Sequence, residues 1–376
     1  MLLTKCYNIQ ASFYQSIQRP IGRSEDNGKI LVAPSDLKPY ICDAKQRCYY
    51  VSALVFSFFG YCIMSTSSLT PEVRSKPIIS QEITFAVVHL MPFGALLTGA
   101  TAFDWIMCVF LYFFRMFWVT GGYHRYFAHK SYKTSRWFQF VIAFMSQTTA
   151  QKGALWWAAH HRHHHRNSDT PSDPHSMKIY GFWYSHIGWI VGPDFKETDY
   201  KVIGDYAKYP ELVWLNKYYL VPPILLALFV MALGGIFNGG SVTEMFTQAG
   251  FSTLFTGFFL STIVLYHATF SINSIMHKVG TQRYESNDES RNSLWLALLT
   301  MGEGWHNNHH YYEVAARQGF FWWEIDITYY ILRGFAAVGL IWDLKEVPRH
   351  IRESRNKQEA AVLRKKFESE RINVSS

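Results

Sequence analysis

Histidine is the residue type whose number and spacing in this chain point most directly to chemistry. The 376 residues include 16 histidines, most of them in four short groups. Neutral imidazole is a good ligand for iron, zinc and copper. Crowded neutral histidines gain little as structural residues, although any one group taken alone also fits adventitious metal affinity. The sequence therefore predicts metal binding.

Two groups place histidines at positions i, i+3 and i+4, which share one face of a helix, so that three imidazoles can meet a metal together. The longer group, residues 160–165, contains two overlapping registers of this pattern. They are His160, His163 and His164, or His161, His164 and His165. The other group is His306, His309 and His310. Spacing alone does not choose between the two registers.

The other two groups are weaker signals taken alone. His124 and His129 are five residues apart, so on an ideal α-helix their side chains point about 140° away from each other. Both can bind one metal only if the helix ends or distorts between them. Asn273 and His277 are one turn apart on one helix face, where a lone histidine is more often a helix-end residue than a ligand.

Together the four groups offer about nine imidazoles, which is too many for one ion, since a zinc site has four ligands, or three and a water molecule when it is catalytic. Nine nitrogen ligands divide naturally into two sites of four or five. The sequence contains no pair of Glu-x-x-His motifs, which disfavours the soluble four-helix type of di-iron carboxylate protein.

The elements that must position these groups are membrane helices. Hydrophobic residues make up 49% of the chain and charged residues 17%, a balance that fits a membrane base joined to a polar body. Four segments are candidate spans, at about 83–102, 105–121, 218–237 and 249–270. Short turns join the members of each pair. The sequence predicts an all-α membrane protein with four transmembrane helices in two hairpins.

Charge gives the orientation of these spans. Residues 99–110 and 231–250 contain no Lys or Arg, whereas the opposite ends of the spans carry many. Cytoplasmic loops collect Lys and Arg, so we expect a helical cap, 122–217 and 271–342, on the cytoplasmic face. All four histidine groups then lie on that side and can converge. The net charge of +8 suits anionic headgroups, phosphates or an acidic partner, and we expect no nucleic-acid partner.

The remaining segments complete the domain prediction. Residues 1–46 are a poorly ordered leader without the pattern of a cleaved signal peptide, residues 47–342 form the main domain, and residues 343–376 form a charged helical tail. The five cysteines form no CxxC pair and predict no cysteine chemistry.

Two apolar segments fall short of a span. Residues 49–64 are too few, and they predict an interfacial helix. Residues 321–342 are interrupted by Glu324, Asp326 and Arg333, and they predict an amphipathic helix on the cap.

With these motifs in view, the chain resembles the membrane acyl-CoA desaturases of the stearoyl-CoA desaturase type and their bacterial relatives. The resemblance covers about residues 85–345, and its box order and spacing are highly specific. The segments that carry it are GGYHRYFAHKSYKTS, WWAAHHRHHHRNSDTPSDPH, GFWYSHIGW, NSIMH and GEGWHNNHHYY.

The resemblance implies two iron ions and a ligand set. The family places the first ligand of its second box four residues after the tryptophan of a Trp-Ala pair, which is Trp157 here and selects the register of His161. His160 and His163 are then surface or neighbouring residues. The implied ligands are His124, His129, His161, His164, His165, His277, His306, His309 and His310, with Asn273 reaching the metal through a water molecule.

Further residues follow from the same resemblance. Ligand histidines need partners for their second nitrogen atoms, and the candidates that flank the boxes are Asp169, Asp173 and Glu303. The implied acyl tunnel includes Gln151, Trp157 and Trp189, for which plain packing is the alternative.

Three positions depart from the animal enzymes. Lys152 and Gly153 replace an asparagine and an aspartate, and His160 replaces an aspartate beside the CoA end. These changes leave the acyl carrier open between CoA and lipid.

The implied reaction is O2-dependent desaturation of a long-chain saturated acyl-CoA, with delta-9 as the expected position. Removing hydrogen from an unactivated methylene exceeds what acid–base side chains can do, so a metal must supply the oxidant. Two adjacent carbons each lose one hydrogen, and water is the product. The chain lacks the His-Pro-Gly-Gly motif of a fused cytochrome b5 domain, so a separate electron donor, such as cytochrome b5 or a ferredoxin, is expected.

Three alternatives remain beside this interpretation. An acyl-lipid desaturase or a membrane di-iron hydroxylase shares the same metal cage, although GFWYSHIGW favours desaturation. A histidine-rich metal transporter or storage protein is disfavoured, because transporters need polar groups inside their spans. The four spans are nearly free of such groups apart from His89, Arg115 and His267.

Overall fold

The computed structural model describes residues 40–42, 48–50, 79–192 and 197–375. The chain divides into two compact units, residues 1–73 and 74–376. In the first unit, strands β1 (Tyr40–Cys42) and β2 (Cys48–Tyr50) pair antiparallel. Nearly all of the interfacial helix predicted over residues 49–64 and most of the predicted leader lie outside the described residues. All further elements belong to the second unit.

Three helices of the described chain are long and apolar enough to cross a membrane, at 102–128, 221–239 and 248–277. The first is α4 (Ala102–Phe117) continued by the π-helix η3 (Trp118–Ala128). The second is α11 (Val221–Gly239). The third consists of α12 (Gln248–Ser252), the π-helix η6 (Thr253–Leu260), α13 (Ser261–Ser274) and the 3-10 turn η7 (Ile275–His277). The spans predicted at 105–121, 218–237 and 249–270 fall on these three helices.

The helix at the position of the remaining predicted span, 83–102, lies four residues earlier in the chain, at 79–98. It consists of α2 (Ile79–Leu90), the 3-10 turn η2 (Met91–Gly94) and α3 (Ala95–Thr98). Pro92 lies at the start of η2 and lacks the backbone N–H of a regular helix. Gly99, with φ of 71°, ends the helix. Its apolar part, 83–98, is shorter than the other three candidates, so a fourth span stays a prediction.

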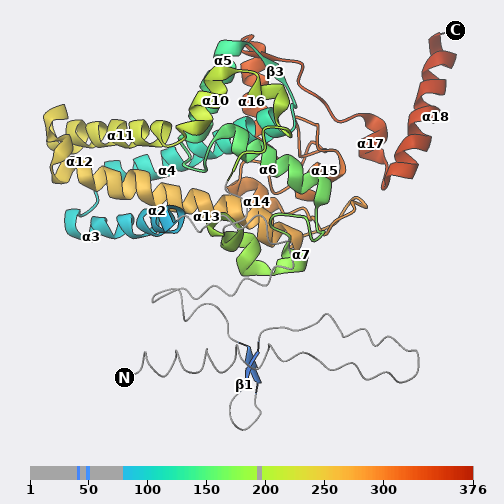
Figure 1. Cartoon of the computed structure of the whole chain (residues 1–376). Coiled ribbons are helices and arrows are strands. Elements are labelled where there is room, and N and C mark those ends of the chain that lie inside the picture. The colour runs from blue at the N-terminus through green and yellow to red at the C-terminus, as the bar shows by residue number, and fades with distance from the viewer. Residues whose placement is uncertain (1–39, 43–47, 51–78, 193–196, 376) are drawn as a thin grey trace. The chain divides into compact units, whose positions relative to one another are not determined.

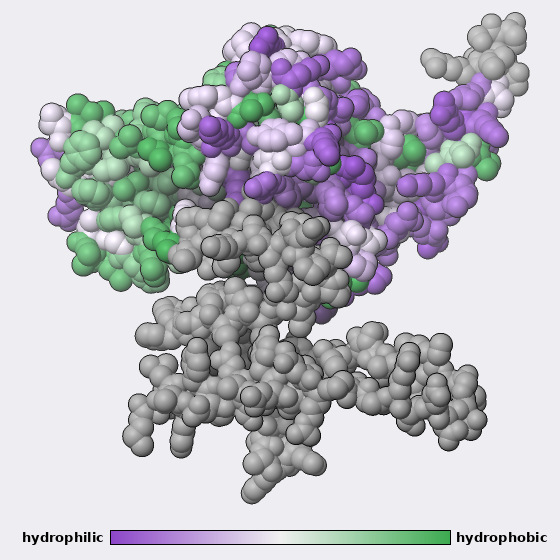
Figure 2. Space-filling model, viewed as in Figure 1, coloured by the Kyte–Doolittle hydropathy of each residue, from purple (hydrophilic) through white to green (hydrophobic). Residues whose placement is uncertain are grey.

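The four apolar helical segments lie side by side (Figure 1), and hydrophobic side chains gather over the end formed by α3, α11 and α12 (Figure 2). The three long helices share a core that includes Met107, Leu111, Val230 and Leu254. Arg115 lies fully buried on α4. Its guanidinium donates to Ser261 Oγ, Thr262 Oγ1 and the Phe258 carbonyl at 2.6, 2.7 and 3.3 Å. These contacts satisfy a cation in an otherwise apolar layer.

A polar cluster joins the helix ends far from the histidines. The Asp104 carboxylate, fully buried, accepts from Asn238 Nδ2 at 2.9 Å and from Thr253 Oγ1 at 2.5 Å. It also forms a capping box with Thr101 at the start of α4. Gln248 Nε2 donates to the Thr98 carbonyl at 2.8 Å. One carboxylate therefore connects all three long helices.

We expect Asp104→Ala to lower the free energy of unfolding by about 1–3 kcal/mol, because the donors of Asn238 and Thr253 lose their buried acceptor. Thermal unfolding of the detergent-purified protein measures this loss. The control is Thr243→Ala, which changes an exposed side chain in the adjacent turn. Equal melting temperatures for the two variants would contradict the assigned role of Asp104.

The cap consists of short helices packed on the π-helix η3. The elements are α5 (Arg136–Gln147), α6 (Ala154–Asn167), α7 (Met177–Tyr180), η4 (Tyr184–Gly188), α8 (Trp189–Val191), α9 (Gly204–Ala207), α10 (Pro210–Lys217), α14 (Leu294–Leu299), α15 (His306–Tyr311) and α16 (Ile327–Ala337). The 3-10 turn η5 (Val242–Phe246) joins α11 to α12. The main core of the cap includes Tyr123, Phe127, Leu155 and Leu215. η3 therefore belongs to the cap as much as to the span that precedes it.

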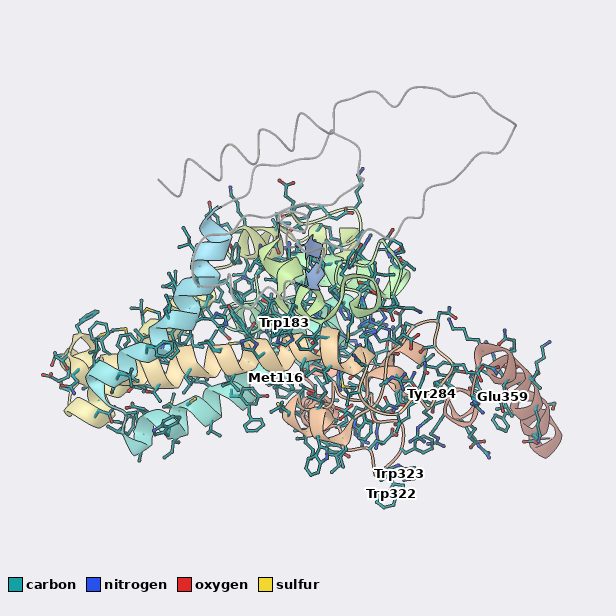
Figure 3. The ribbon with its side chains drawn as sticks, turned by 90° about the horizontal axis from the view of Figure 1, so that it is seen from below. Met116, Trp183, Tyr284, Trp322, Trp323 and Glu359 are labelled. Atoms are coloured by element: carbon teal, nitrogen blue, oxygen red, sulfur yellow. The ribbon has the colours of Figure 1, made fainter. Side chains whose placement is uncertain are left out.

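The helix predicted over 321–342 is only half as long in the structure. α16 begins after Asp326, whose side chain accepts from the Tyr329 N–H and caps the helix. Trp322 and Trp323 precede it in a turn and project outward (Figure 3), with exposed fractions of 80% and 50%. After α16, strand β4 (Ile341–Trp342) pairs antiparallel with β3 (Lys133–Thr134). The charged segment beyond forms α17 (Arg349–Glu353) and α18 (Lys357–Ser375).

Candidate metal centre

All nine histidines implied as ligands come together in two clusters. Within each cluster, one nitrogen atom of every histidine lies within 4.8 Å of those of the others. The five-histidine cluster is His124, His129, His161, His165 and His309. The four-histidine cluster is His164, His277, His306 and His310. The division into sites of five and four is the one expected from the number of imidazoles.

The π-helix η3 explains how His124 and His129 meet. A π-helix joins residues five apart through i→i+5 hydrogen bonds, and the His129 N–H donates to the His124 carbonyl at 3.1 Å. The two rings therefore lie on one side of the helix, with their centroids 4.8 Å apart. The structure thus meets the condition set by this spacing, a distorted helix that ends at the second histidine.

Each HxxHH box serves both clusters, so the expectation that one box presents three imidazoles to one metal is wrong. On α6, His161 and His165 belong to the five-histidine cluster, and His164 belongs to the other. On α15, His309 joins the first cluster, while His306 and His310 join the second. Adjacent helical residues point about 100° apart, so His164 and His165 face different clusters.

The register of the second box agrees with the one that the resemblance selects. His160 lies beside Trp156, and its Nδ1 contacts the Trp156 carbonyl at 2.9 Å. His163 Nε2 contacts the Ser172 carbonyl at 2.8 Å. Neither residue belongs to a cluster.

Side-chain hydrogen bonds to neighbouring elements hold the two box helices, α6 and α15, in place. α6 begins at Gly153, where a Cβ atom would overlap Asn216 Oδ1. That oxygen accepts from the Trp156 N–H at 2.9 Å and so satisfies a free donor of the first turn. On α15, Asn307 Oδ1 accepts two backbone N–H groups at 2.8 Å, and Asn308 Nδ2 donates to Glu324 at 2.8 Å. The asparagines between the histidines therefore anchor the box.

Carboxylates face the outer nitrogen atoms of five histidines. The Nδ1–oxygen distances are 2.5 Å for His124–Glu303, 3.1 Å for His165–Glu313, 2.9 Å for His164–Asp173, 3.3 Å for His277–Asp169 and 2.5 Å for His310–Asp288. A carboxylate only accepts, so each Nδ1 carries the proton and each Nε2 keeps a lone pair. The lone pairs of these five histidines therefore face the cluster interiors.

The inner nitrogen atoms converge in a way that fits metal ions. The Nε2 atoms of His124 and His165 both lie 3.0 Å from that of His309, and His161 Nε2 lies 2.9 Å from His129 Nε2. Two ligands bound to one ion at about 2.1 Å and at right angles are about 3 Å apart. Lone pairs turned toward one another repel unless a cation lies between them. His310 Nε2 is buried and has no protein partner among the described residues.

The pKa values of the cluster histidines and of the carboxylates beside them also favour metal binding. Burial and neighbouring imidazoles lower the pKa of His129, His161, His165, His306 and His309 well below the ordinary value. Burial opposes ionisation of Asp169, but the contact with His277 outweighs it and lowers the pKa of Asp169 to about 2. The pKa values of Asp173, Asp288 and Glu303 also fall, against the effect of burial, beside their histidines. The five imidazoles with lowered pKa are neutral, the state in which histidine binds a metal. Burial lowers the pKa of His164 as well, but its Asp173 partner outweighs burial and raises it.

The sequence indicated only some of the carboxylates that face the cluster histidines. Asp169, Asp173 and Glu303 were candidates, whereas Glu313 and Asp288 were missed. Glu313 follows the third box by three residues, a spacing that offered a signal, whereas Asp288 lies in a loop without pattern. His175 was also missed. It is buried beside His164, with ring centroids 4.2 Å apart, and forms a third group with His164 and Asp173.

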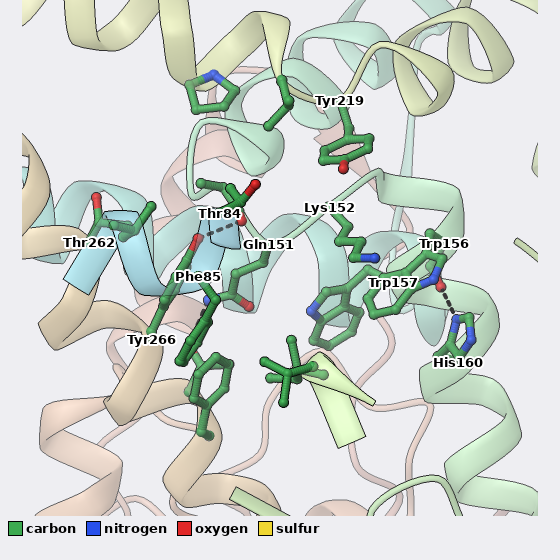
Figure 4. Close-up of a pocket in the computed structure, with 18 of the residues that line it drawn as sticks. Thr84, Phe85, Gln151, Lys152, Trp156, Trp157, His160, Tyr219, Thr262 and Tyr266 are labelled. Carbon is green, nitrogen blue, oxygen red and sulfur yellow. Dashed lines mark hydrogen bonds between the residues drawn. The ribbon is translucent and has the colours of Figure 1, made fainter. Parts of the chain in front are cut away.

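A cavity of about 430 Å³ extends from the five-histidine cluster between the apolar helices. Its wall includes Phe85 and Tyr266 on one side and Trp156 and Lys152 on the other (Figure 4). The cavity is mostly apolar, which suits an acyl chain. Five residues predicted for the site or the tunnel line it, namely Gln151, Trp157, His161, Trp189 and Asn273.

Trp157 connects the cavity to the five-histidine cluster. Its ring stacks between Tyr123 and His161, with centroid distances of 5.5 and 4.8 Å. Gln151 Nε2 donates to Thr269 Oγ1 at 3.0 Å. Asn273 lies one turn before His277 on the third long helix, and its carbonyl accepts from Ser185 Oγ at 3.2 Å.

Comparison with known proteins adds an independent line of support. The sequence model of the fatty acid desaturase family matches residues 101–342. The chain is 34% identical over 286 residues to the sn-2 palmitoyl-lipid 9-desaturase of Nostoc sp. (strain 36), covering 73% of this chain and 93% of that protein. It is 33% identical to the sn-1 stearoyl-lipid 9-desaturase of Synechocystis sp. over 302 residues, 78% of this chain and 89% of that protein. It is 31% identical to an acyl-CoA 5-desaturase of Anemone leveillei over 283 residues, 74% of this chain and 83% of that protein.

Proposed function

The chain belongs to the fatty acid desaturase family, and we propose that it introduces a delta-9 double bond into a long saturated acyl chain at a histidine-bound di-iron centre. The observation that carries the proposal is the cavity, which begins at His161 of the five-histidine cluster and runs between the apolar helices. The resemblance drawn from the histidine boxes is confirmed at the level of the family.

The donor set fits two iron ions. The five-histidine cluster would hold one ion and the four-histidine cluster the other, with Asn273 reaching the second ion through a water molecule. Imidazole suits iron, and the carboxylates behind it hold the rings in the required tautomer. When bound, the two ions use O2 and two electrons from a separate donor to supply the oxidising power that no side chain has.

The chain's own residues position the substrate. Aromatic walls hold the acyl chain extended beside the five-histidine cluster, so that one pair of carbon atoms faces the oxidant. The lining residues Phe258, Tyr266 and Phe270 exclude water from this pair, which prevents loss of oxidising equivalents. The cavity wall therefore decides which carbons react.

Two features support a membrane protein with its active site on the cytoplasmic face. The histidine clusters lie at the ends of the long helices opposite to the Asp104 cluster. The turns at the Asp104 end carry no Lys or Arg between residues 99–110 and 231–250, as expected for the far side of the membrane. The four-span topology and the division into a leader, a desaturase domain (47–342) and a tail (343–376) belong to this proposal.

Acyl-CoA is the proposed carrier, and a membrane glycerolipid is the second candidate. The names of the Nostoc and Synechocystis relatives favour a lipid carrier, whereas the name of the Anemone relative favours CoA. Lys152, which lines the cavity and lies over the Trp156 ring at 5.0 Å, offers a positive charge to the phosphate of either carrier.

Expression in desaturase-deficient cells tests the reaction. We expect the wild-type chain to produce monounsaturated acyl chains with a delta-9 double bond, and the double variant His161→Ala, His165→Ala to produce none, since two of the five imidazoles are lost. Mass spectrometry of the cellular lipids measures both. Hydroxylated products, or no product when matched electron donors are supplied, would contradict desaturation.

The purified protein distinguishes the carriers. Stearoyl-CoA and a stearoyl glycerolipid in mixed micelles are offered separately with a reducing system. Product from the CoA substrate alone supports the proposal, and product from the lipid alone supports the second candidate.

A further inference from the structure

Three histidines outside both clusters form a continuous contact chain between the apolar helices and the cap. His89 Nε2 lies 3.3 Å from His267 Nε2, and His267 Nδ1 lies 3.0 Å from His186 Nε2. His186 Nδ1 lies 2.9 Å from Ser274 Oγ. At the other end, His89 Nδ1 lies 2.8 Å from the Phe85 carbonyl. Polar side chains between apolar membrane helices are costly, and their presence points to a role.

The fixed acceptor at one end sets the direction of every hydrogen bond. A carbonyl only accepts, so the proton of His89 is on Nδ1, and its Nε2 accepts. His267 therefore donates from Nε2 and accepts at Nδ1. His186 then donates from Nε2 and accepts the Ser274 hydroxyl proton at Nδ1. This one assignment satisfies all four contacts with neutral rings.

The reverse direction requires a charge. If the Ser274 hydroxyl donated to the Phe270 carbonyl, 3.0 Å away, His186 would donate to Ser274 and the direction would reverse along the chain. His89 would then carry two protons. A cation placed between apolar helices is costly. The neutral direction, from Ser274 to Phe85, is the stable one.

The histidine chain packs on a face of α13 adjacent to the face that lines the cavity. His267 and Ser274 are seven residues apart and share one helix face, whereas Tyr266, Phe270 and Asn273 line the cavity. At the α2 end, the Phe85 ring also lines the cavity and stacks on Tyr266 with an interplanar angle of 4°. One end of the histidine chain therefore contacts the carbonyl of Phe85, whose ring lines the cavity. The other end contacts Ser274 Oγ, next to the candidate ligand Asn273.

We propose that Ser274, His186, His267 and His89 form a polarised latch that fixes the α2 wall of the cavity to the helix turn of Asn273 and His277. The three histidines are positioning residues, which set where the acyl chain lies relative to the metal centre. This inference rests on the proposed desaturase function for its product readout, but its hydrogen-bond pattern does not.

Two substitutions at one position separate the two halves of the latch. His267→Asn keeps an acceptor near the position of Nδ1 for His186 but is too short to reach His89. His267→Gln places an amide donor near the position of Nε2 for His89 but loses the acceptor for His186. The α2 wall is thus released only in His267→Asn. His350→Asn on α17, outside the latch and the site, is the control.

The product readout is the distribution of double-bond positions at equal iron content. In His267→Asn the minor positional isomers are expected to rise roughly fivefold, the change that corresponds to the loss of about 1 kcal/mol of wall positioning. In His267→Gln they are expected to stay at the wild-type level. The same isomer distribution in both variants and the wild type would overturn the latch, as would loss of iron from His267→Asn.

A second readout is independent of activity. Histidine ¹⁵N NMR of the metal-free protein, assigned with single substitutions, is expected to show His89 protonated on Nδ1 and His186 and His267 protonated on Nε2. An opposite set of tautomers, or a cationic ring at neutral pH, would overturn the proposal. If the wild type forms no unsaturated product, the proposed function fails, and these tautomers still decide the latch.

Discussion

Replacing His310 by alanine is expected to abolish desaturation and to lower the bound iron from two ions to about one per chain. The four-histidine cluster would keep three imidazoles, and the Asp288 carboxylate, 2.5 Å from His310 Nδ1, would lose its partner. Neighbouring ligands and their partners act together, so one lost imidazole weakens the whole site. Metal analysis of the purified protein and product analysis of the same sample measure the two effects.

The second box supplies matched controls for this prediction. His165→Ala removes a member of the five-histidine cluster and is expected to lower the iron content and the activity in the same way. His163→Ala, two residues earlier, removes a ring whose Nε2 contacts the Ser172 carbonyl, and both quantities are expected to stay within the wild-type range. Full iron content in the His310 variant would refute the proposed ligand set.

Replacing Glu303 by glutamine is expected to weaken iron binding about 10–100-fold, because Glu303 fixes the tautomer of His124. Its carboxylate is buried and lies 2.5 Å from His124 Nδ1 and 3.3 Å from the Arg125 guanidinium. The neutral amide also removes a negative charge beside the buried Arg125 guanidinium. This loss costs about 3 kcal/mol of unfolding free energy. Iron titration and thermal unfolding of the metal-free protein measure the two losses separately.

Glu313→Gln is the matched comparison. Glu313 also faces a cluster histidine, with Oε2 at 3.1 Å from His165 Nδ1, but its side chain is 49% exposed. Water can replace an exposed carboxylate, so the loss in unfolding free energy is expected to be at most about 1 kcal/mol. Losses of similar size in the two variants would show that burial does not decide the strength of these carboxylate contacts.

Local patterns in the sequence were enough to predict the histidine boxes and the end of the helices at which they lie. Imidazole spacing within one helix is local, so the boxes at 160–165 and 306–310 were readable without a structure. Apolar length and the distribution of Lys and Arg are also local properties. They predicted spans at 105–121, 218–237 and 249–270. These fall on the observed helices 102–128, 221–239 and 248–277, the first and third of which extend seven residues further at their C-terminal ends. The condition on His124 and His129, a distorted helix, followed from helix geometry alone.

How these local patterns combine depends on the packing of distant segments. The boxes divide between two clusters because α6 and α15 bring their rings together across more than 140 residues of chain, as in the contact of His165 with His309. Asp288 contacts His310 from 22 residues earlier in the chain, in a loop with no periodicity. The helix at 79–98 ends four residues before its predicted end because Gly99 adopts a φ of 71°, which a helix cannot continue. Residue spacing carries information about neighbours on one helix, whereas pairing between helices depends on packing that no single segment encodes.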